Sequence, residues 1–478
     1  MALVTPVDPV PPAELGRVHF AGIGGAGMSG IARILLARGV AVSGSDAVPS
    51  DLLDELAALG AAVHVGHDGA NVDGVDTLVV STAIRPGNPE LAEARRRGIR
   101  VLHRAGALGS VMLGRRGIAV AGTHGKTTTT SMLTTILRGC GADPSYVIGG
   151  ILADTGLGAA DGSGAEFVAE ADESDGSFLM LSPYAAVVTC IEADHMDNYG
   201  SLAEIEAAFL AFAARISAGG LLVASADDPG ARALAAAASD LPVRVRTYGL
   251  ADDADYLVSG VTPRGMAISA TVTPGPRARL SAGDGIPVQV RVPGRHNALN
   301  AAAALAAAIE LGYPADQVAA GLTAYGGARR RMELKGEADG VRVLDSYAHH
   351  PTELTADLRA ARDVAAGGRV IAVFQPHLYS RTRIFAAEFA VALGLADEAL
   401  VLDVYAARED PEPGVTGNMV AAAVPGGALY LPDRADVPAA VASLAKPGDL
   451  VLTMGAGDVT ALGPLIVAAL RARAGAAW

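Results

Sequence analysis

A short segment rich in glycine and threonine, Ala121-Gly-Thr-His-Gly-Lys-Thr-Thr-Thr-Thr130, contains the residue types that hold phosphate. Lys126 is one of only three lysines beside 34 arginines, so this position favours a compact ammonium group. Residues 117–121 have the composition of a buried strand, and residues 127–138 have the apolar spacing of a helix. The glycines therefore lie in a strand-to-helix turn, where helix amides favour an anion and the lysine can reach phosphate oxygens.

This loop is shorter than the usual phosphate-binding pattern, because Val120 occupies the place of its first glycine. A plain turn is the alternative interpretation. We favour ATP binding, since strand, loop, lysine, hydroxyl and helix agree, and Thr127 can offer its hydroxyl to Mg²⁺.

Carboxylates and a histidine follow two further strand-like segments. Glu170, Asp172, Glu173 and Asp175 come after the apolar residues 167–169, and His195 follows the apolar residues 187–191. An acidic solvated loop and a structural histidine are the alternatives. Because ligands gather at the carboxyl ends of strands in α/β sheets, we expect the carboxylates to bind a hard cation such as Mg²⁺ near the phosphate loop. His195 could help to bind a second metal or the phosphate that is transferred.

A second glycine loop, Gly22-Ile-Gly24-Gly25-Ala-Gly27, follows the strand-like residues 18–21, and Asp46 ends the next predicted strand. The pattern is typical of dinucleotide binding, which favours a nicotinamide oxidoreductase if it is taken alone. The same geometry suits the diphosphate of a UDP-sugar. We favour the UDP-sugar, because a dehydrogenase has no use for the ATP loop that follows.

The 478 residues predict about three domains, and the fold class is α/β throughout. We expect a flexible tail at 1–15, a Rossmann-like UDP-sugar-binding domain at 16–115, a P-loop ATPase-like central domain at 116–327 with a β-rich insertion at 244–292, and a Rossmann-like C-terminal domain at 328–478. Predicted strands of the first domain are 17–21, 40–44, 62–65 and 76–80, and those of the last are 342–345, 369–374, 398–403 and 449–453.

Composition excludes several classes of protein. A net charge of −14 argues against nonspecific nucleic-acid binding. Cys140 and Cys190 form neither a disulfide framework nor a metal-ligand pattern, which fits a reducing cytoplasm. No long apolar run predicts a membrane span, and no signal peptide is visible. Of the two arginine clusters, 95–97 is expected on a solvated helix face, and 329–331 is the better candidate for phosphate.

Seven motifs together resemble the Mur ligases of peptidoglycan synthesis, and within them the branch that adds L-alanine. They are HFAGIGGAGMSGIA (19–32), GTHGKTTT (122–129), EADESDGSF (170–178), EADHMDNYG (192–200), PGRHNALNA (293–301), DSYAHHPTE (345–353) and FQPHLYSRT (374–382). The resemblance covers nearly the whole chain and implies an enzyme of cell wall biogenesis, and so of cell shape and division, located in the cytoplasm as a monomer or homodimer.

The resemblance implies that ATP phosphorylates the lactyl carboxylate of UDP-N-acetylmuramate and that the amine of L-alanine then attacks the acyl phosphate. ATP and Mg²⁺, with Mn²⁺ as an alternative, are the implied cofactors. No nucleic acid or membrane insertion is implied. A ligase that joins a preformed peptide to the same sugar nucleotide, and a noncatalytic UDP-sugar sensor, are the alternatives; residues 345–382 should separate the two ligases.

Site residues carried over from the resemblance fall into five groups. The expected UDP-sugar contacts are Gly22, Gly24, Gly25, Ala26, Gly27, Ser45, Asp46, Ser81, Thr82 and Ala83. The expected ATP contacts are Gly122, Thr123, His124, Gly125, Lys126, Thr127, Thr128, His296, Asn297, Arg330, Arg331 and Asp345. The expected amino-acid pocket is Tyr347, His349, His377 and Arg381. The expected metal ligands are Thr127, Glu170, Glu173 and His195. The expected catalytic residues are Lys126, Glu173, His195, His349 and Arg381.

Two departures from the family pattern matter. Cys190 stands where the family usually has asparagine, which puts a polar contact at that point in question. Several sister ligases use a carbamylated lysine, but this chain has no lysine between Lys126 and Lys335, which agrees with the alanine-adding branch.

Overall fold

The protein is described by a computed structural model covering residues 4–196, 198–280, 283, 285–407 and 409–476. Its contacts divide the chain into two units. The first unit contains residues up to 259, residues 271–288 and residues 299–325, and the second contains residues 260–270, 289–298 and 326 onward. Residues 260–270 and 289–298, which the sequence assigned to the central domain, therefore group with the C-terminal part of the chain.

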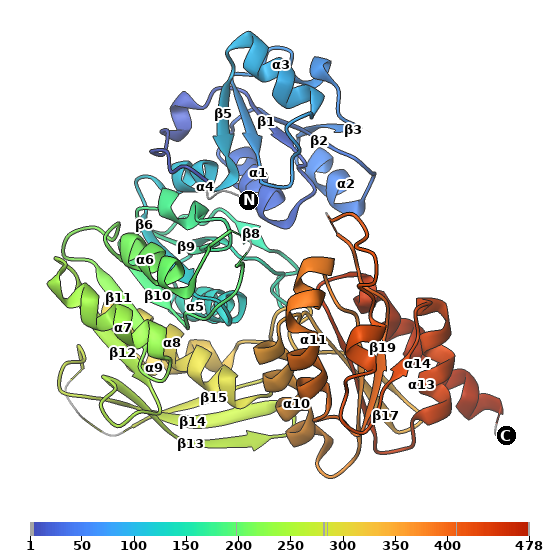
Figure 1. Cartoon of the computed structure of the whole chain (residues 1–478). Helices are drawn as coiled ribbons and strands as arrows, with labels where there is room; N and C mark the ends of the chain where they lie inside the picture. Colours follow the sequence, from blue (N-terminus) through green and yellow to red (C-terminus); the bar gives the residue numbers. More distant parts are fainter. Residues whose placement is uncertain (1–3, 197, 281–282, 284, 408, 477–478) are drawn as a thin grey trace. The chain divides into compact units, whose positions relative to one another are not determined.

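The N-terminal module of the first unit is a parallel sheet of five strands in the order β3-β2-β1-β4-β5 (Figure 1). Its elements are β1 (Val18–Ala21), α1 (Ala26–Ala37), β2 (Val42–Asp46), α2 (Asp51–Ala58), β3 (Ala62–Val65), β4 (Thr77–Val80), α3 (Pro89–Arg97), β5 (Arg100–His103) and α4 (Arg104–Met112). The four predicted strands are confirmed within two residues at each end, and β5 was missed. The arginines at 95–97 are exposed in the last turn of α3, as expected.

The central module, which belongs to the first unit except for residues 260–270 and 289–298, is built on a sheet of ten strands in the order β15-β14-β13-β12-β11-β10-β6-β9-β7-β8. Its strands are β6 (Arg116–Ala121), β7 (Ser145–Val147), β8 (Ala159–Ala160), β9 (Glu166–Glu170), β10 (Ala185–Val188), β11 (Leu221–Ser225), β12 (Arg244–Gly249), β13 (Tyr256–Arg264), β14 (Ala267–Pro274) and β15 (Ile286–Val290). Its helices are α5 (Lys126–Gly139), α6 (Leu202–Ala213), α7 (Pro229–Ala237), α8 (Arg295–Leu311) and α9 (Ala315–Thr323). The β-rich insertion is confirmed as β12 to β15, and its strands extend the main sheet.

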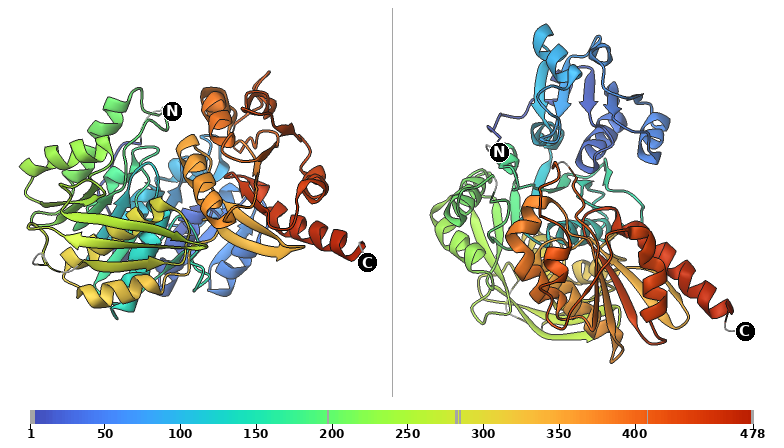
Figure 2. Two further views of the ribbon diagram at one scale, coloured as in Figure 1. Left: turned by 90° about the horizontal axis from the view of Figure 1, so that it is seen from below. Right: turned by 45° about the vertical axis from the view of Figure 1, so that its right-hand side comes forward.

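The C-terminal module of the second unit has six strands in the order β16-β17-β21-β18-β19-β20. Its elements are β16 (Glu333–Ala338), β17 (Val341–Ser346), α10 (Pro351–Ala365), β18 (Val370–Phe374), α11 (Tyr379–Leu393), β19 (Glu398–Val401), α12 (Asn418–Ala421), β20 (Leu429–Tyr430), α13 (Val437–Leu444), β21 (Leu450–Met454) and α14 (Leu462–Ala476). Helices α10 and α11 cover one face of this sheet and α13 and α14 the other (Figures 1 and 2).

Alternating side chains along the strands explain these two faces. In β18, Val370, Ala372 and Phe374 pack toward α10 and α11, while Ile371 and Val373 pack toward α13 and α14. Every second residue points the same way in a strand, so a strand buried on both faces is apolar throughout. The four strands predicted here are confirmed, while the edge strands β16 and β20 were missed.

The proline-rich N-terminal segment is attached to the first unit. The amide of Val4 donates to the carbonyl of Asp175 at 3.0 Å, the amide of Val10 donates to the hydroxyl of Ser110 at 3.0 Å, and Leu15 is buried. The sequence predicted a flexible tail over 1–15, but residues 4–15 make these contacts; residues 1–3 lie outside the described part of the chain.

Candidate active site

The phosphate loop connects β6 to α5, as the sequence predicted. Gly122 and Gly125 have φ of +130° and +81°, a backbone region that favours glycine. A Cβ on Gly125 would also lie 2.6 Å from the side-chain oxygen of Asn300. Two glycines are thus required for the sharp turn that aims the first amides of α5 out of the sheet edge.

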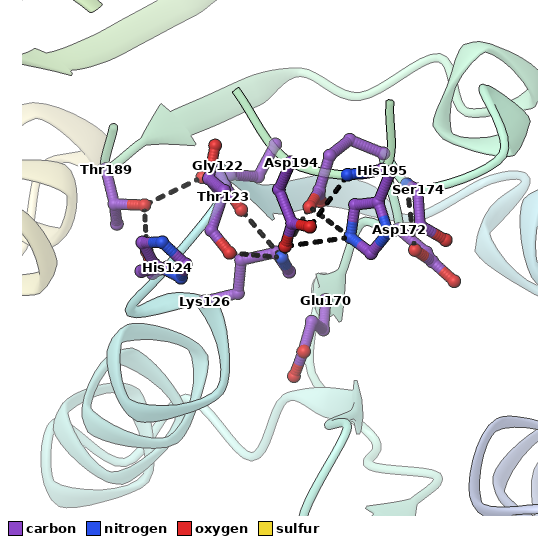
Figure 3. Close-up of polar contacts among 12 residues, drawn as sticks. Gly122, Thr123, His124, Lys126, Glu170, Asp172, Ser174, Thr189, Asp194 and His195 are labelled. Carbon is purple, nitrogen blue, oxygen red and sulfur yellow. Dashed lines mark hydrogen bonds and ion pairs between the residues drawn. The ribbon is translucent and has the colours of Figure 1, made fainter. Parts of the chain in front are cut away.

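Lys126 is held by the loop it belongs to (Figure 3). Its ammonium donates to the carbonyls of Gly122 at 2.7 Å and Thr123 at 3.1 Å, and to Oε1 of Glu173 at 2.8 Å. Burial would lower the pKa of the lysine, but Glu173 and its acidic neighbours hold it above the ordinary value. The lysine therefore remains a cation at neutral pH.

Thr127 and Glu170 bring oxygen atoms together beside the first turn of α5. The threonine hydroxyl donates to Oε1 of Glu170 at 3.0 Å, and the amide of Gly149 donates to Oε2 at 2.6 Å. Glu170 is the last residue of β9, the strand hydrogen-bonded next to β6. A hydroxyl and a carboxylate at this spacing are hard oxygen donors of the kind that Mg²⁺ prefers.

The acidic cluster after β9 contains carboxylates in different electrostatic surroundings. Burial and the nearby charge of Asp172 raise the pKa of Glu173 to about 7, although Lys126 opposes the shift. Burial also works against ionisation of Asp172, yet Arg104 and Ser174 hold the pKa of that carboxyl well below its ordinary value. Glu173 is buried, and its Oε2 has no hydrogen-bond partner among the described residues.

His195 lies beside this cluster, as Figure 3 shows. Its Nε2 is 3.5 Å from Oδ2 of Asp194 and 4.0 Å from Oε1 of Glu173. His195 has φ of +55°, and such strained backbone in a non-glycine residue is often found at functional sites. The structure thus brings Lys126, Glu173 and His195 together; position 197 of the same motif lies outside the described residues.

Cys190 retains a polar contact with the loop. Strand β10 ends at Val188, earlier than the predicted 187–191 segment, and the next residues turn back toward the phosphate loop. The amide of His124 donates to the sulfur of Cys190 at 3.3 Å, and the hydroxyl of Thr189 donates to the carbonyl of His124. Burial raises the pKa of the Cys190 thiol to about 12, so it stays neutral.

The glycine loop at 22–27 is accessible and is held from β2. The amides of Gly22 and Ile23 donate to the carbonyl of Ser45, and the amide of Gly24 donates to Oδ2 of Asp46 at 2.9 Å. Gly25 and Ala26 are exposed at the start of α1. The turn at 81–83, exposed at Thr82 and Ala83, follows the neighbouring strand β4.

Ser45 was expected to contact the UDP-sugar, but its side chain points into a buried network. It is fully buried, and its hydroxyl donates to Oε2 of Glu90 at 2.8 Å. The same carboxylate lies 3.0 Å from Nδ1 of His67 and accepts from the amide of Asn71 at 2.8 Å. Ser45 therefore supports the glycine loop through its backbone, while its hydroxyl belongs to a buried network.

In the second unit, Asp345 and Arg330 are joined in a network around the end of β17. Both oxygens of the buried Asp345 carboxylate accept hydroxyl protons, from Thr453 at 2.7 Å and from Thr460 at 2.7 Å. Nε of Arg330 lies 3.5 Å from Oδ2 of Asp345, and its Nη2 donates to the carbonyl of Gly455 at 2.5 Å. The expected direct contact of Asp345 with ATP is not supported by this placement.

Four aromatic rings form a row in the second unit. Ring centroids of Tyr347 and His349 are 5.3 Å apart, those of His349 and His377 are 6.0 Å apart, and those of His377 and Tyr405 are 5.8 Å apart. Arg381 is buried in the first turns of α11. Arg331 lies over the Tyr347 ring at 5.4 Å. Three of the predicted pocket residues, Tyr347, His349 and His377, thus come together, and Tyr405 joins them although the sequence did not indicate it.

His296 and Asn297 open α8 and belong by contacts to the second unit. Nε2 of His296 is 3.7 Å from Oδ1 of Asp357, and the side-chain amide of Asn297 donates to the carbonyl of Pro293 at 2.6 Å. His350, the second histidine of the doubled pair, accepts an amide proton at the start of α10 and so caps that helix.

Comparison with known proteins decides the family. The Mur ligase family catalytic domain matches residues 17–116, the Mur ligase middle domain matches 120–308, and the Mur ligase glutamate ligase domain matches 330–457. The chain belongs to the Mur ligase family. The three-domain α/β fold is therefore that of a Mur ligase.

Individual Mur ligases resemble the chain over nearly its full length. UDP-N-acetylmuramate–L-alanine ligases from Thermobifida fusca and Kineococcus radiotolerans are 57% and 58% identical, over 98% and 96% of this chain and 100% and 98% of their own. The crystal structure of the UDP-N-acetylmuramate-alanine ligase from Thermotoga maritima has a TM-score of 0.80 at 27% identity, covering 97% of this chain and 100% of its own. A murein peptide ligase from Psychrobacter arcticus has a TM-score of 0.69 at 26% identity, over 95% and 99%.

Two residues in contact with predicted site residues, one in each unit, were not indicated by the sequence. Arg104 donates through Nη2 to Oδ2 of Asp172 at 2.6 Å, and Tyr405 stacks on His377. In each pair the two residues are far apart in sequence, so no local pattern predicts their contact. Among the described residues, no helix is long and apolar enough to cross a membrane.

Proposed function

We propose that this Mur ligase joins L-alanine to the lactyl carboxylate of UDP-N-acetylmuramate at the expense of ATP, giving UDP-N-acetylmuramoyl-L-alanine, ADP and phosphate. The observation that carries the proposal is the Lys126 ammonium, held on a phosphate loop beside Glu173 and His195, in a chain 57% identical to such a ligase. A sensor that only binds nucleotide has no need of this set of groups.

ATP is assigned to the loop Gly122–Thr128, whose first helical amides favour an anion. Lys126 would exchange its carbonyl partners for the terminal phosphates and neutralise charge that develops there during transfer. By the resemblance, His296, Asn297, Arg330 and Arg331 are also assigned as ATP contacts. We assign Asp345 the task of holding Arg330 in place, because its carboxylate is buried, accepts from Thr453 and Thr460, and lies 3.5 Å from Nε of Arg330.

Mg²⁺ fits the donors present. Thr127 and Glu170 would hold the ion that accompanies ATP, and Glu173 with His195 would hold a second one. The buried Oε2 of Glu173, which lacks a partner among the described residues, agrees with a ligand role for that carboxylate. A bound divalent ion supplies charge neutralisation to the phosphates, and Mn²⁺ shares the same preference for oxygen ligands.

The UDP-sugar is assigned to the N-terminal module. Its diphosphate would lie on the amides of Gly22 to Gly27 at the start of α1, with Asp46 holding the loop and the turn Ser81–Thr82–Ala83 beside the uridine. L-Alanine is assigned to Tyr347, His349, His377 and Arg381, where the guanidinium pairs with the amino-acid carboxylate.

The chemistry requires two transfers. A lactyl carboxylate oxygen attacks the terminal phosphorus of ATP, and the bond to ADP breaks. The amine nitrogen of L-alanine then attacks the acyl carbon, loses a proton, and phosphate leaves from the tetrahedral intermediate. We assign the receipt of that proton to His349, whose ring adjoins those of Tyr347 and His377 in the assigned pocket. Alignment of reactants and neutralisation of charge supply most of the acceleration.

The deciding experiment measures phosphate release with ATP, Mg²⁺ and UDP-N-acetylmuramate over a panel of amino acids and the tripeptide that a peptide ligase would use. We expect release to depend on L-alanine, with a product heavier by one alanine residue in mass spectrometry. Turnover with the tripeptide alone would make the chain a peptide ligase. Nucleotide binding without turnover on any member of the panel would favour a sensor.

A further inference from the structure

Arg104 stands where the N-terminal module meets the acidic cluster of the central module. It is the first residue of α4 and directly follows His103, the last residue of β5. Its side chain is 22% exposed, so most of it is buried between the two modules of the first unit.

One end of the guanidinium is fixed by the central module. Nη2 donates to Oδ2 of Asp172 at 2.6 Å, and Asp172 precedes Glu173, the partner of Lys126. Charge-assisted hydrogen bonds of this length are short and directional, so Asp172 sets the orientation of the arginine.

The other end of the guanidinium faces the glycine loop. A Cβ on Gly27 would lie 2.8 Å from Nη1 and 3.0 Å from Cδ of Arg104, so the arginine passes directly over the first turn of α1. Neither Nη1 nor Nε makes a hydrogen bond to any described residue. A guanidinium has five N–H donors, and most of those on Arg104 remain available at the place where the helix amides favour an anion.

We propose that Arg104 binds the diphosphate of the sugar nucleotide through Nη1 and Nε while Nη2 stays on Asp172. This inference rests on the proposed function, which places the diphosphate on the loop at Gly22 to Gly27. Glycine at position 27 is then needed to make room for the arginine as well as for the ligand. One side chain thereby connects sugar-nucleotide binding to the acidic strand end that carries the partner of Lys126.

Calorimetric titration of the full chain without ATP tests the proposal, because it needs no turnover. We expect Arg104→Gln to weaken binding of UDP and UDP-N-acetylmuramate by about 10- to 100-fold, the range for loss of a charged hydrogen bond. The affinity for uridine, which has no diphosphate, should be unchanged. Arg104→Lys should recover part of the loss because it keeps the charge.

Two further variants separate ligand binding from a purely structural ion pair. Asp172→Asn removes the tether but keeps the guanidinium, so its effect on UDP affinity should be several-fold smaller than that of Arg104→Gln. Arg95→Gln makes the same charge change at an exposed position of α3 and should leave affinity unaltered. Circular dichroism and melting curves confirm that each variant is folded.

Three results would count against the inference. Unchanged UDP affinity in folded Arg104→Gln would overturn it, and so would equal losses in Arg104→Gln, Asp172→Asn and their double variant, which indicate only the ion pair. An equal loss for uridine would place the arginine away from the diphosphate. Failure of the unmodified protein to bind UDP or UDP-N-acetylmuramate would overturn the proposed function itself.

Discussion

The buried carboxylate of Glu90 offers a quantitative test of how the N-terminal module is stabilised. Glu90 is fully buried and is surrounded by the hydroxyl of Ser45, the amide of Asn71, and the rings of His67 and His19. Burial alone would raise the pKa of Glu90, but these partners lower it to about 2. The perturbation is Glu90→Gln, which preserves shape and removes the charge.

The magnitude follows from the difference in pKa between the folded and unfolded chain. Each pKa unit corresponds to about 1.4 kcal/mol, so a fall from 4.5 to about 2 corresponds to about 3 kcal/mol of stability at neutral pH. Because the folded pKa is the lower one, this contribution is complete above the unfolded pKa and disappears as pH falls through the folded pKa. The difference in free energy of unfolding between wild type and Glu90→Gln should therefore be largest near neutral pH. It should shrink as the pH falls from about 5 to about 2.

This difference in stability can be measured locally by urea unfolding that is monitored through hydrogen-exchange mass spectrometry of peptides from β1 and β2. A local measurement is needed because a chain of two units need not unfold in one step. Glu93→Gln is the matched control. Its pKa is also lowered to about 2, by Arg96 and Arg97, but both arginines are exposed, so solvent screens the interaction. Equal losses in the two variants, or a gap for Glu90→Gln that does not change with pH, would refute the reasoning.

Three further predictions concern the proposed reaction. Lys126→Ala should abolish ATP turnover and leave UDP-N-acetylmuramate binding nearly intact. Normal phosphate release by this variant would show that the loop does not bind ATP. Arg381→Ala should raise KM for L-alanine by at least about tenfold, with little change in KM for ATP, and equal effects would contradict the pocket. Gly125→Ala should lose most turnover, because its Cβ meets Asn300, whereas Gly141→Ala, also at positive φ but with nothing within 4 Å, should cost about 1 kcal/mol of stability and keep activity.

The sequence predicted the strand-to-helix turns well, because they are marked by local chemistry. The loops at 22–27 and 122–127 combine glycine with an apolar strand before them and a helical pattern after them, and both lie where expected. Strand β5, by contrast, has arginine and histidine at its ends, and β16 is polar and irregular at Gly336. Neither carries the alternation or apolar run on which strand prediction depends.

Side-chain direction was harder to predict than position. Ser45 and Asp345 both lie at strand ends near a predicted ligand, yet both point into buried networks whose partners are far away in sequence. Arg104 and Asp172 are separated by 68 positions, so their contact depends on how two modules pack. Local pattern identifies which residues reach a site, but tertiary packing decides which of their atoms face it.

Each of the two units is made of three separate stretches of the chain, which limits how the protein can be truncated or recombined. The backbone passes from one unit to the other five times, at 259/260, 270/271, 288/289, 298/299 and 325/326. A fragment starting at residue 328 would therefore lack the hairpin tip at 260–270, whose Met266 packs on the core of the second unit, and the segment 289–298. A chimera that exchanges only the C-terminal third with a relative would therefore divide the second unit. A chimera designed to fold should exchange residues 260–270, 289–298 and 326 onward together.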